Sequence, residues 1–187
     1  MATIINAICD NIGSAHPTIE YGGDIKLTWD QDITARELVG YVAEINGAFA
    51  RFNGAGNLEF IKFKDLTPVQ TIYDWACGDL KLGETKTIER VALNSGVNSV
   101  FYPNNEVSGS TVYINQDNIL LTDTGTYTIE NIIKHIWDEV NGFTFSLITV
   151  KTCLFDGNIK PGDLIKFVIN NEEYITIAQI DWTYNTR

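Results

Sequence analysis

The stretch that decides the fold of this chain is Asp32–Phe60, DITARELVGYVAEINGAFARFNGAGNLEF. Thr34 lies three residues before Glu37, a spacing at which the hydroxyl and the carboxylate each bind a free backbone N–H at a helix start. This capping box predicts a helix that begins directly after Thr34. Apolar residues then recur at helical spacing and predict one buried face: Leu38, Val39, Tyr41, Val42, Ile45 and Phe49.

Gly47 marks the expected end of this helix, because a residue without a Cβ enters the left-handed conformation at little cost. Two segments rich in apolar and aromatic residues follow, Ala48–Phe52 and Asn57–Phe63. Between them, Asn53–Gly56 supplies residues that accept the positive φ angles of a tight loop. The sequence therefore predicts a helix that continues into a β-hairpin.

The residues before this stretch extend it into a small domain. Isoleucines at helical spacing predict a short helix over Met1–Gly13, which Gly13 ends. Asp24–Trp29 alternates polar and apolar side chains, with Ile25, Leu27 and Trp29 on one side, as is typical of a half-buried strand. We interpret residues 1–63 as a small α/β domain.

The rest of the chain, residues 64–187, is predicted to be a β-rich, barrel-like domain. The pattern weakens over Lys64–Leu82, where we place the boundary. β-branched and aromatic residues then predict strands at Thr87–Leu93, Val97–Tyr102, Ser110–Asn115, Thr144–Leu154, Asp163–Ile169 and Glu173–Trp182. Turns are expected at Pro161-Gly162 and at Asn170-Asn171.

One helix interrupts these strands. Thr128 is a suitable N-cap, and an apolar stripe over residues 129–140 ends before Asn141-Gly142. Strands exceed helices without regular βαβ alternation, so the predicted class is α+β. We expect the second domain to be a barrel or a split sheet with this one helix packed on it.

The helix-to-hairpin stretch resembles the central hub, or tail-associated, proteins of bacteriophage tails and prophage particles. Those proteins carry a threonine, an Arg-Glu pair, an "IAE" turn, a glycine and a hairpin that ends in "dGkL". The matching residues here are Thr34, Arg36, Glu37, Leu38, Tyr41, Ala43, Glu44, Gly47, Phe49, Ala50, Arg51, Gly56 and Leu58. The order of elements in the second half also follows that family, including Pro161-Gly162-Asp163 before a strand.

This resemblance implies a tail-tube-like fold and a non-enzymatic structural role in a phage or prophage tail or baseplate hub. Its implied partners are other tail or baseplate proteins, with a homotrimer in the full-length parent. The implied location is the virion tail, after a period in the bacterial cytoplasm. Family members carry a further N-terminal part of the barrel, so this sequence resembles a fragment that lacks it.

Composition narrows the classes of partner. Thirteen basic and twenty-four acidic residues give a net charge of −11, which disfavours tight binding of nucleic acid. The acidity is explained by solubility, or, given the resemblance, by a channel that repels passing DNA. No apolar run approaches the roughly 20 residues that span a bilayer, so no membrane insertion is expected. The cysteines, Cys9, Cys77 and Cys153, are odd in number and widely spaced, and we expect reduced thiols.

No catalytic, cofactor-binding or metal-binding residue is predicted. His16 and His135 are expected to face solvent, and His135 with Asp138 lacks a second histidine or cysteine on its helix face to complete a metal site. Two carboxylate pairs are interpreted as surface charge rather than as a glycosidase site: Asp30 with Asp32, and Glu172 with Glu173.

Two alternative functions stay open from the sequence. A carbohydrate-binding module of a phage tail would use aromatic side chains as a stacking platform. Trp29 and Trp137 belong to predicted core faces, whereas Trp75, Tyr102 and Tyr113 have no such assignment and are the candidates for it. A tail hydrolase is the less favoured alternative, because no nucleophile motif or paired acid and base is evident.

Overall fold

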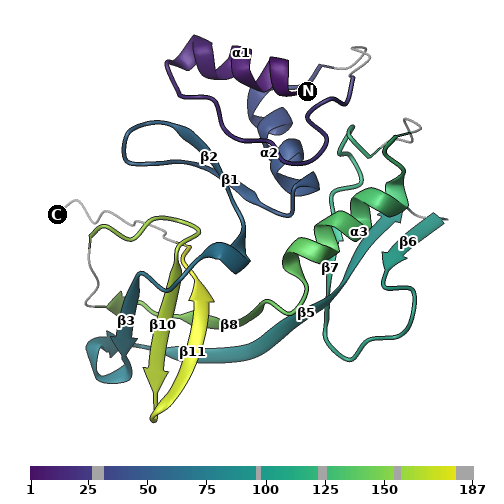
Figure 1. Ribbon diagram of the computed structural model, residues 1–187. Helices are drawn as coiled ribbons and strands as arrows, with labels where there is room; N and C mark the ends of the chain where they lie inside the picture. Colours follow the sequence, from purple (N-terminus) through teal and green to yellow (C-terminus); the bar gives the residue numbers. More distant parts are fainter. Residues whose placement is uncertain (27–31, 96–97, 122–125, 154–156, 180–187) are drawn as a thin grey trace. The chain divides into compact units, whose positions relative to one another are not determined.

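The computed structural model describes residues 1–26, 32–95, 98–121, 126–153 and 157–179. Within these residues the chain forms three α-helices and eleven strands (Figure 1). The predicted α+β class is confirmed. The strands lie in separate sheets, and none of the described sheets closes into a barrel. Of the two predicted alternatives, the structure therefore has the split sheet.

The chain divides into two compact units, each built from two separate segments. Unit 1 contains residues 1–65 and 88–143, and unit 2 contains residues 66–87 and 144–187. The chain first passes from unit 1 to unit 2 after residue 65, close to the predicted boundary after residue 63. The division nevertheless differs from the predicted domains 1–63 and 64–187, because residues 88–143, including the predicted helix 129–140, group with the N-terminal residues.

The helices at the start of unit 1 form where the sequence predicts them. Helix α1 (Ala2–Ile12) ends at Gly13, which has a φ of 70°. Helix α2 (Ala35–Ile45) begins at Thr34 with the predicted capping box. The Thr34 backbone N–H donates to Oε2 of Glu37 at 2.8 Å, and the Glu37 N–H donates to the Thr34 hydroxyl at 3.2 Å. The buried face of α2 contains Leu38, Val42, Ala43 and Ile45.

The predicted hairpin follows α2 directly. Gly47 has a φ of 59°, and strands β1 (Phe49–Phe52) and β2 (Leu58–Ile61) pair in antiparallel fashion. The side chain of Asn53 organises the tip, because its Oδ1 accepts the backbone N–H groups of Ala55 and Asn57. The polypeptide then forms the short 3₁₀ helix η1 (Phe63–Asp65).

A second sheet of unit 1 lies against helix α3 (Ile129–Val140). The later part of strand β5 (Lys81–Ser95) pairs antiparallel with β6 (Asn98–Tyr102) and parallel with β7 (Ser110–Ile114). Helix α3 begins at the predicted N-cap, Thr128, and contacts β6, α2 and η1. Its predicted apolar stripe is buried at Ile132, Ile133, Ile136 and Val140.

The strand predicted over Asp24–Trp29 is not seen where the structure describes it. Residues 24–26 form a turn and a loop, in which Ile25 is buried and its carbonyl accepts the N-terminal amine of Met1 at 2.7 Å. Leu27 and Trp29 lie outside the described residues. Of the apolar residues in this pattern, Ile25 is the one within the described part of the chain, and it is buried without strand pairing.

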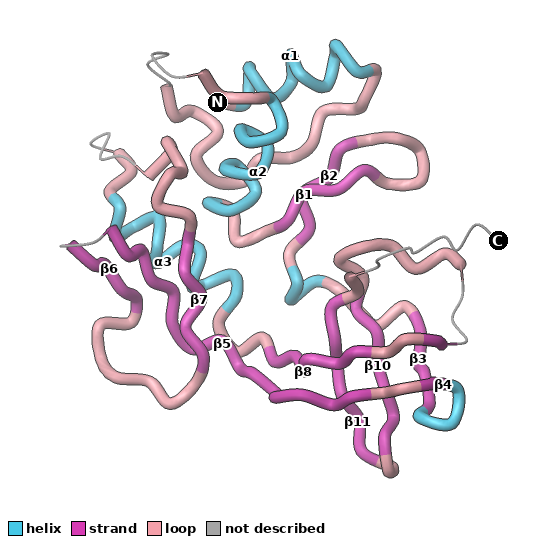
Figure 2. Tube along the Cα trace, turned by 180° about the vertical axis from the view of Figure 1, so that it is seen from behind, coloured by secondary structure: helices cyan, strands magenta, loops and turns pink. Residues whose placement is uncertain are grey.

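Unit 2 is centred on a three-stranded sheet (Figure 2). Its middle strand, β10 (Leu164–Ile169), is antiparallel to β11 (Glu172–Ile177) and parallel to β3 (Gln70–Tyr73). The predicted turn at Asn170 and Asn171 is confirmed by their φ angles of 53° and 68°. Strand β3 lies in the segment that we interpreted as a boundary, because Pro68 and Gly78 interrupt the pattern on either side of this short strand.

The remaining strands of unit 2 form two antiparallel pairs. The first part of β5 pairs with β8 (Thr144–Thr149), which contacts β11. Strand β4 (Cys77–Gly78), which follows the 3₁₀ helix η2 (Asp74–Ala76), pairs with β9 (Thr152–Cys153). The predicted strand over residues 144–154 is therefore split into two. The core of the unit is apolar and consists of Ile72, Ile159, Ile165, Phe167, Ile169 and Ala178.

Candidate functional site

The outward face of strand β3 is an apolar surface that follows from the alternation of the strand. Ile72 is buried in the core, whereas Val69, Thr71 and Tyr73 point to the other side and are exposed. Trp75 follows in η2 and is 78% exposed, and its ring stacks on that of Tyr73 with centroids 5.9 Å apart. We call Val69, Thr71, Tyr73 and Trp75 the β3 surface.

A carboxylate fixes the end of this surface. Oδ1 of Asp74 accepts the backbone N–H of Trp75 at 2.7 Å, and Oδ2 accepts the backbone N–H of Asn170 at 3.0 Å. The same side chain thus connects η2 to the turn between β10 and β11. Strand β3 also pairs with β10. The backbone before Trp75 is therefore joined to the sheet both by strand pairing and by the hydrogen bond from Asn170 to Asp74.

The three aromatic candidates from the sequence have different environments. Trp75 is exposed as described, and Tyr113, on β7, is 66% exposed. Tyr102 is half-buried against the ring of Trp137, with centroids 4.9 Å apart, and Nζ of Lys134 lies 5.5 Å from its ring centroid. Trp75 and Tyr102 belong to different units. The ring beside Trp75 is instead Tyr73, which the sequence did not single out.

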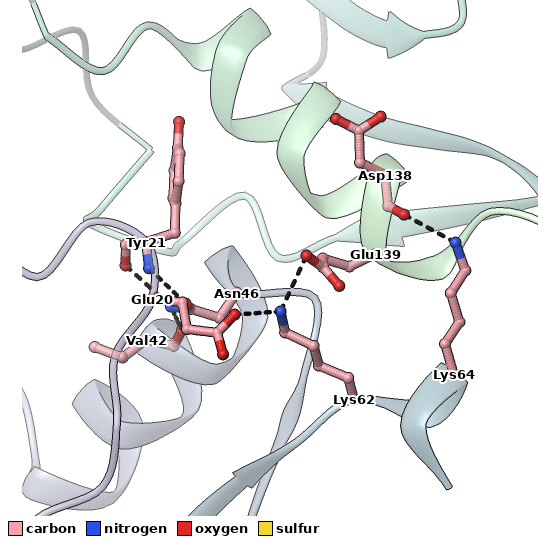
Figure 3. A network of polar contacts seen from close by, with 8 residues as sticks. All are labelled: Glu20, Tyr21, Val42, Asn46, Lys62, Lys64, Asp138 and Glu139. Carbon is pink, nitrogen blue, oxygen red and sulfur yellow. Dashed lines mark hydrogen bonds and ion pairs between the residues drawn. The ribbon is translucent and has the colours of Figure 1, made fainter.

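A polar network in unit 1 connects the hairpin to neighbouring elements (Figure 3). Nζ of Lys62 binds Oε2 of Glu20 at 2.5 Å and Oε1 of Glu139 at 3.0 Å. Burial alone would lower the pKa of Lys62, but its hydrogen bonds to both carboxylates outweigh burial and raise it. The hydrogen bond from Lys62 also lowers the pKa of Glu20. The lysine therefore stays charged, which suits a structural connection.

Asn46 completes the same network at the end of α2. It is 3% exposed, and its Nδ2 donates to the carbonyls of Val42 at 2.8 Å and Tyr21 at 3.1 Å. Its Oδ1 accepts the Tyr21 backbone N–H at 2.9 Å. Every polar atom of the side chain is thus used to fix the segment around Tyr21 on α2.

The expectation that both histidines face solvent is wrong for His135. Its ring is half-buried and stacks on Tyr21, with centroids 4.0 Å apart and planes 12° apart. Its Nε2 has no hydrogen-bond partner in the structure, and burial lowers the pKa of the imidazole. The segment around Tyr21 covers this side of α3, which periodicity within the helix does not reveal. His16 is exposed as expected, and its Nε2 lies 2.8 Å from Oδ1 of Asp10.

Of the two carboxylate pairs considered from the sequence, Glu172 and Glu173 each bind a neighbouring side chain of the same hairpin. Glu172 accepts the hydroxyl of Tyr174 at 2.6 Å, and Glu173 binds Lys166 at 2.8 Å. Asp32 is exposed, and Asp30 lies outside the described residues. In the part of the chain that the structure describes, no group of three or more histidine, cysteine and acidic side chains is arranged to hold a metal ion.

The structure brings together two cysteines that the sequence separates. Cys77 on β4 is directly opposite Cys153 on β9, and their sulfur atoms are 3.5 Å apart. Both are half-buried thiols, whereas Cys9 is fully buried in unit 1. Their spacing of 76 residues gave no signal of this pairing.

Comparison with known proteins found no match among protein-family models, curated proteins or solved structures. Among the described helices, none has the length and apolar character needed to cross a membrane.

Proposed function

We propose that this chain is a non-enzymatic structural component of a phage or prophage tail or baseplate hub, and that it acts by contacts with copies of itself and with other tail proteins. The proposal is supported by the helix-to-hairpin stretch Asp32–Phe60, whose residues carry the resemblance to hub proteins. The observation that carries the mode of action is the β3 surface, in which Trp75 is 78% exposed and stacks on Tyr73.

This surface has the properties of a protein contact. Among the strands that the structure describes, β3 lies at the edge of its sheet, and edge strands accept further strands from other chains. Exposed tryptophan and tyrosine side chains contribute much of the affinity of protein interfaces. Because Asp74 already orders the backbone at Trp75, binding there costs little further conformational entropy.

The proposed assembly of the full-length parent is a ring of three copies, in which each copy contacts the next through a heterologous interface that includes the β3 surface. Its partners above and below are other tail or baseplate proteins, and its location is the virion tail after assembly in the bacterial cytoplasm. The net charge of −11 disfavours retention of DNA that passes through such a ring.

Self-association tests this proposal through a matched pair of variants. Sedimentation velocity over a wide concentration range is expected to show reversible self-association of the wild-type chain at high concentration. Trp75→Ala should weaken association by about 2 kcal/mol, which is roughly 30-fold in the dissociation constant. Tyr113→Ala removes an exposed aromatic ring from unit 1 and is expected to leave association unchanged.

The coding neighbourhood gives an independent test, because genes of tail components are clustered. We expect neighbouring genes for tape-measure, tube or baseplate proteins, and binding of at least one of their products to this chain. Neighbours of unrelated function, together with a chain that stays monomeric at all concentrations, would show that the proposal is wrong.

A saccharide-binding module of a phage tail is the second candidate, favoured by the exposed, stacked rings of Tyr73 and Trp75. Calorimetric titration with cell-wall saccharides separates the two functions. Saturable binding that is lost in Trp75→Ala, without any self-association, would favour the module. Tyr102→Ala is the control, because that ring is half-buried against Trp137.

A further inference from the structure

Cys77 and Cys153 have the geometry from which a disulfide forms with little movement. Facing residues of antiparallel strands have Cα atoms about 4.5 to 5.5 Å apart, which is within the roughly 4.4 to 6.8 Å that disulfides span. The two sulfur atoms are 3.5 Å apart, about 1.5 Å more than a sulfur–sulfur bond. Formation of the bond requires the two sulfur atoms to approach by this distance.

We propose that Cys77 and Cys153 form a covalent modification site, at which a small-molecule disulfide such as oxidised glutathione converts the two thiols into an intramolecular disulfide. A thiolate of the protein attacks one sulfur of the oxidant and releases one glutathione thiolate. The second cysteine then attacks the mixed disulfide and releases the second glutathione. Two protons and two electrons leave the protein, and the glutathione disulfide is reduced to two thiols.

Each step of this exchange requires one of the two thiols to ionise. Burial, together with the hydrogen bond and charge of Cys153, raises the pKa of Cys77 to about 12, so Cys77 remains a thiol at neutral pH. Only a thiolate attacks a disulfide efficiently. Both cysteine residues are only half-buried, so we expect a small oxidant to reach them.

The bond would connect the two separate segments of unit 2. Cys77 belongs to residues 66–87, and Cys153 belongs to residues 144–187. In the structure these segments are held together by noncovalent strand pairing and by the shared core. A disulfide would add a covalent link in an oxidising environment, and a reducing cytoplasm would keep it open. This inference rests on the geometry of unit 2 and is independent of the proposed tail function.

The test is thiol counting on the full chain after equilibration with oxidised glutathione. Free thiols are alkylated after unfolding, and the intact mass is measured. We expect one alkylated cysteine, Cys9, and a monomer that is two hydrogen atoms lighter, with a Cys77–Cys153 cross-link in the non-reduced peptide map. Three alkylated cysteines, stable glutathione adducts, or a cross-link to Cys9 would overturn the proposal.

Variants supply the controls. Cys77→Ser and Cys153→Ser should each abolish the cross-link, whereas Cys9→Ala should retain it. Oxidation is expected to raise the Tm of the wild-type chain by roughly 5 °C or more and to leave that of Cys77→Ser unchanged. The wild-type peptide map decides the matter even if a serine variant fails to fold. An equal shift of Tm in Cys77→Ser would assign the effect to another cause.

Discussion

Replacement of Gly47 by alanine tests how the end of α2 is packed. Gly47 has a φ of 59°, a left-handed conformation that costs other residues about 1 to 2 kcal/mol. A Cβ added there would lie 2.5 Å from Cβ of Glu139 on α3 and 3.4 Å from the carbonyl oxygen of Ile136. Relief of such an overlap in a packed region costs a further 1 to 3 kcal/mol, approximately. We therefore expect Gly47→Ala to lower the free energy of unfolding by about 3 kcal/mol or more.

Gly56 at the hairpin tip provides a matched control. Its φ is 79°, but no atom lies within 4 Å of an added Cβ, so Gly56→Ala should cost only the conformational term of about 1 to 2 kcal/mol. Urea unfolding followed by circular dichroism measures both variants, with unchanged m-values as the condition for comparison. Equal losses in the two variants would refute close packing of the α2 terminus against α3.

Three further predictions concern unit 1. Thr34→Ala removes the N-cap of α2 and should lower the free energy of unfolding, measured in urea, by about 1 kcal/mol. An unchanged or higher free energy of unfolding would contradict the capping box. Asn46→Ala leaves the backbone N–H and carbonyl of Tyr21 without their partner and should lower the free energy of unfolding by about 2 to 4 kcal/mol. The control is Asn131→Ala at an exposed position, which should change the free energy of unfolding by no more than about 0.5 kcal/mol. Because burial lowers the pKa of His135 from its usual 6.5, the unfolded chain binds a proton there more readily, so the Tm should fall as the pH drops from above 6.5. His135→Gln should reduce that dependence, and an unchanged pH profile would argue against burial of the ring.

The parts of the fold that sequence reasoning predicted are those fixed by nearby residues. The capping box at Thr34, the left-handed Gly47 and the tip of the first hairpin depend on contacts within a few positions, and all are present. Helix α3 was predicted to the residue, because its N-cap and its apolar stripe lie within the element. Interactions between residues close together in the chain are therefore sufficient to predict such features.

The features that were missed depend on residues far apart in the chain. Strand β3 is stabilised by parallel pairing with β10, 95 residues later in the chain, and its own four residues are too short a run to identify it from the sequence. His135 is half-buried because Tyr21 stacks on it, and Cys77 meets Cys153 only through the β4–β9 pair. The β3 surface was likewise only partly anticipated, through Trp75, since the partner ring Tyr73 is recognised once the strand is known.

The interleaved course of the chain has a consequence for biosynthesis. Unit 1 requires residues 88–143, so it cannot be completed until the ribosome has passed Phe143, and residues 66–87 must wait for the segment that begins at Thr144. A chain that terminates within residues 66–143 would lack part of both units and would expose apolar side chains that the complete chain buries. Expression of either unit alone would accordingly need a rearranged gene that joins its two segments directly.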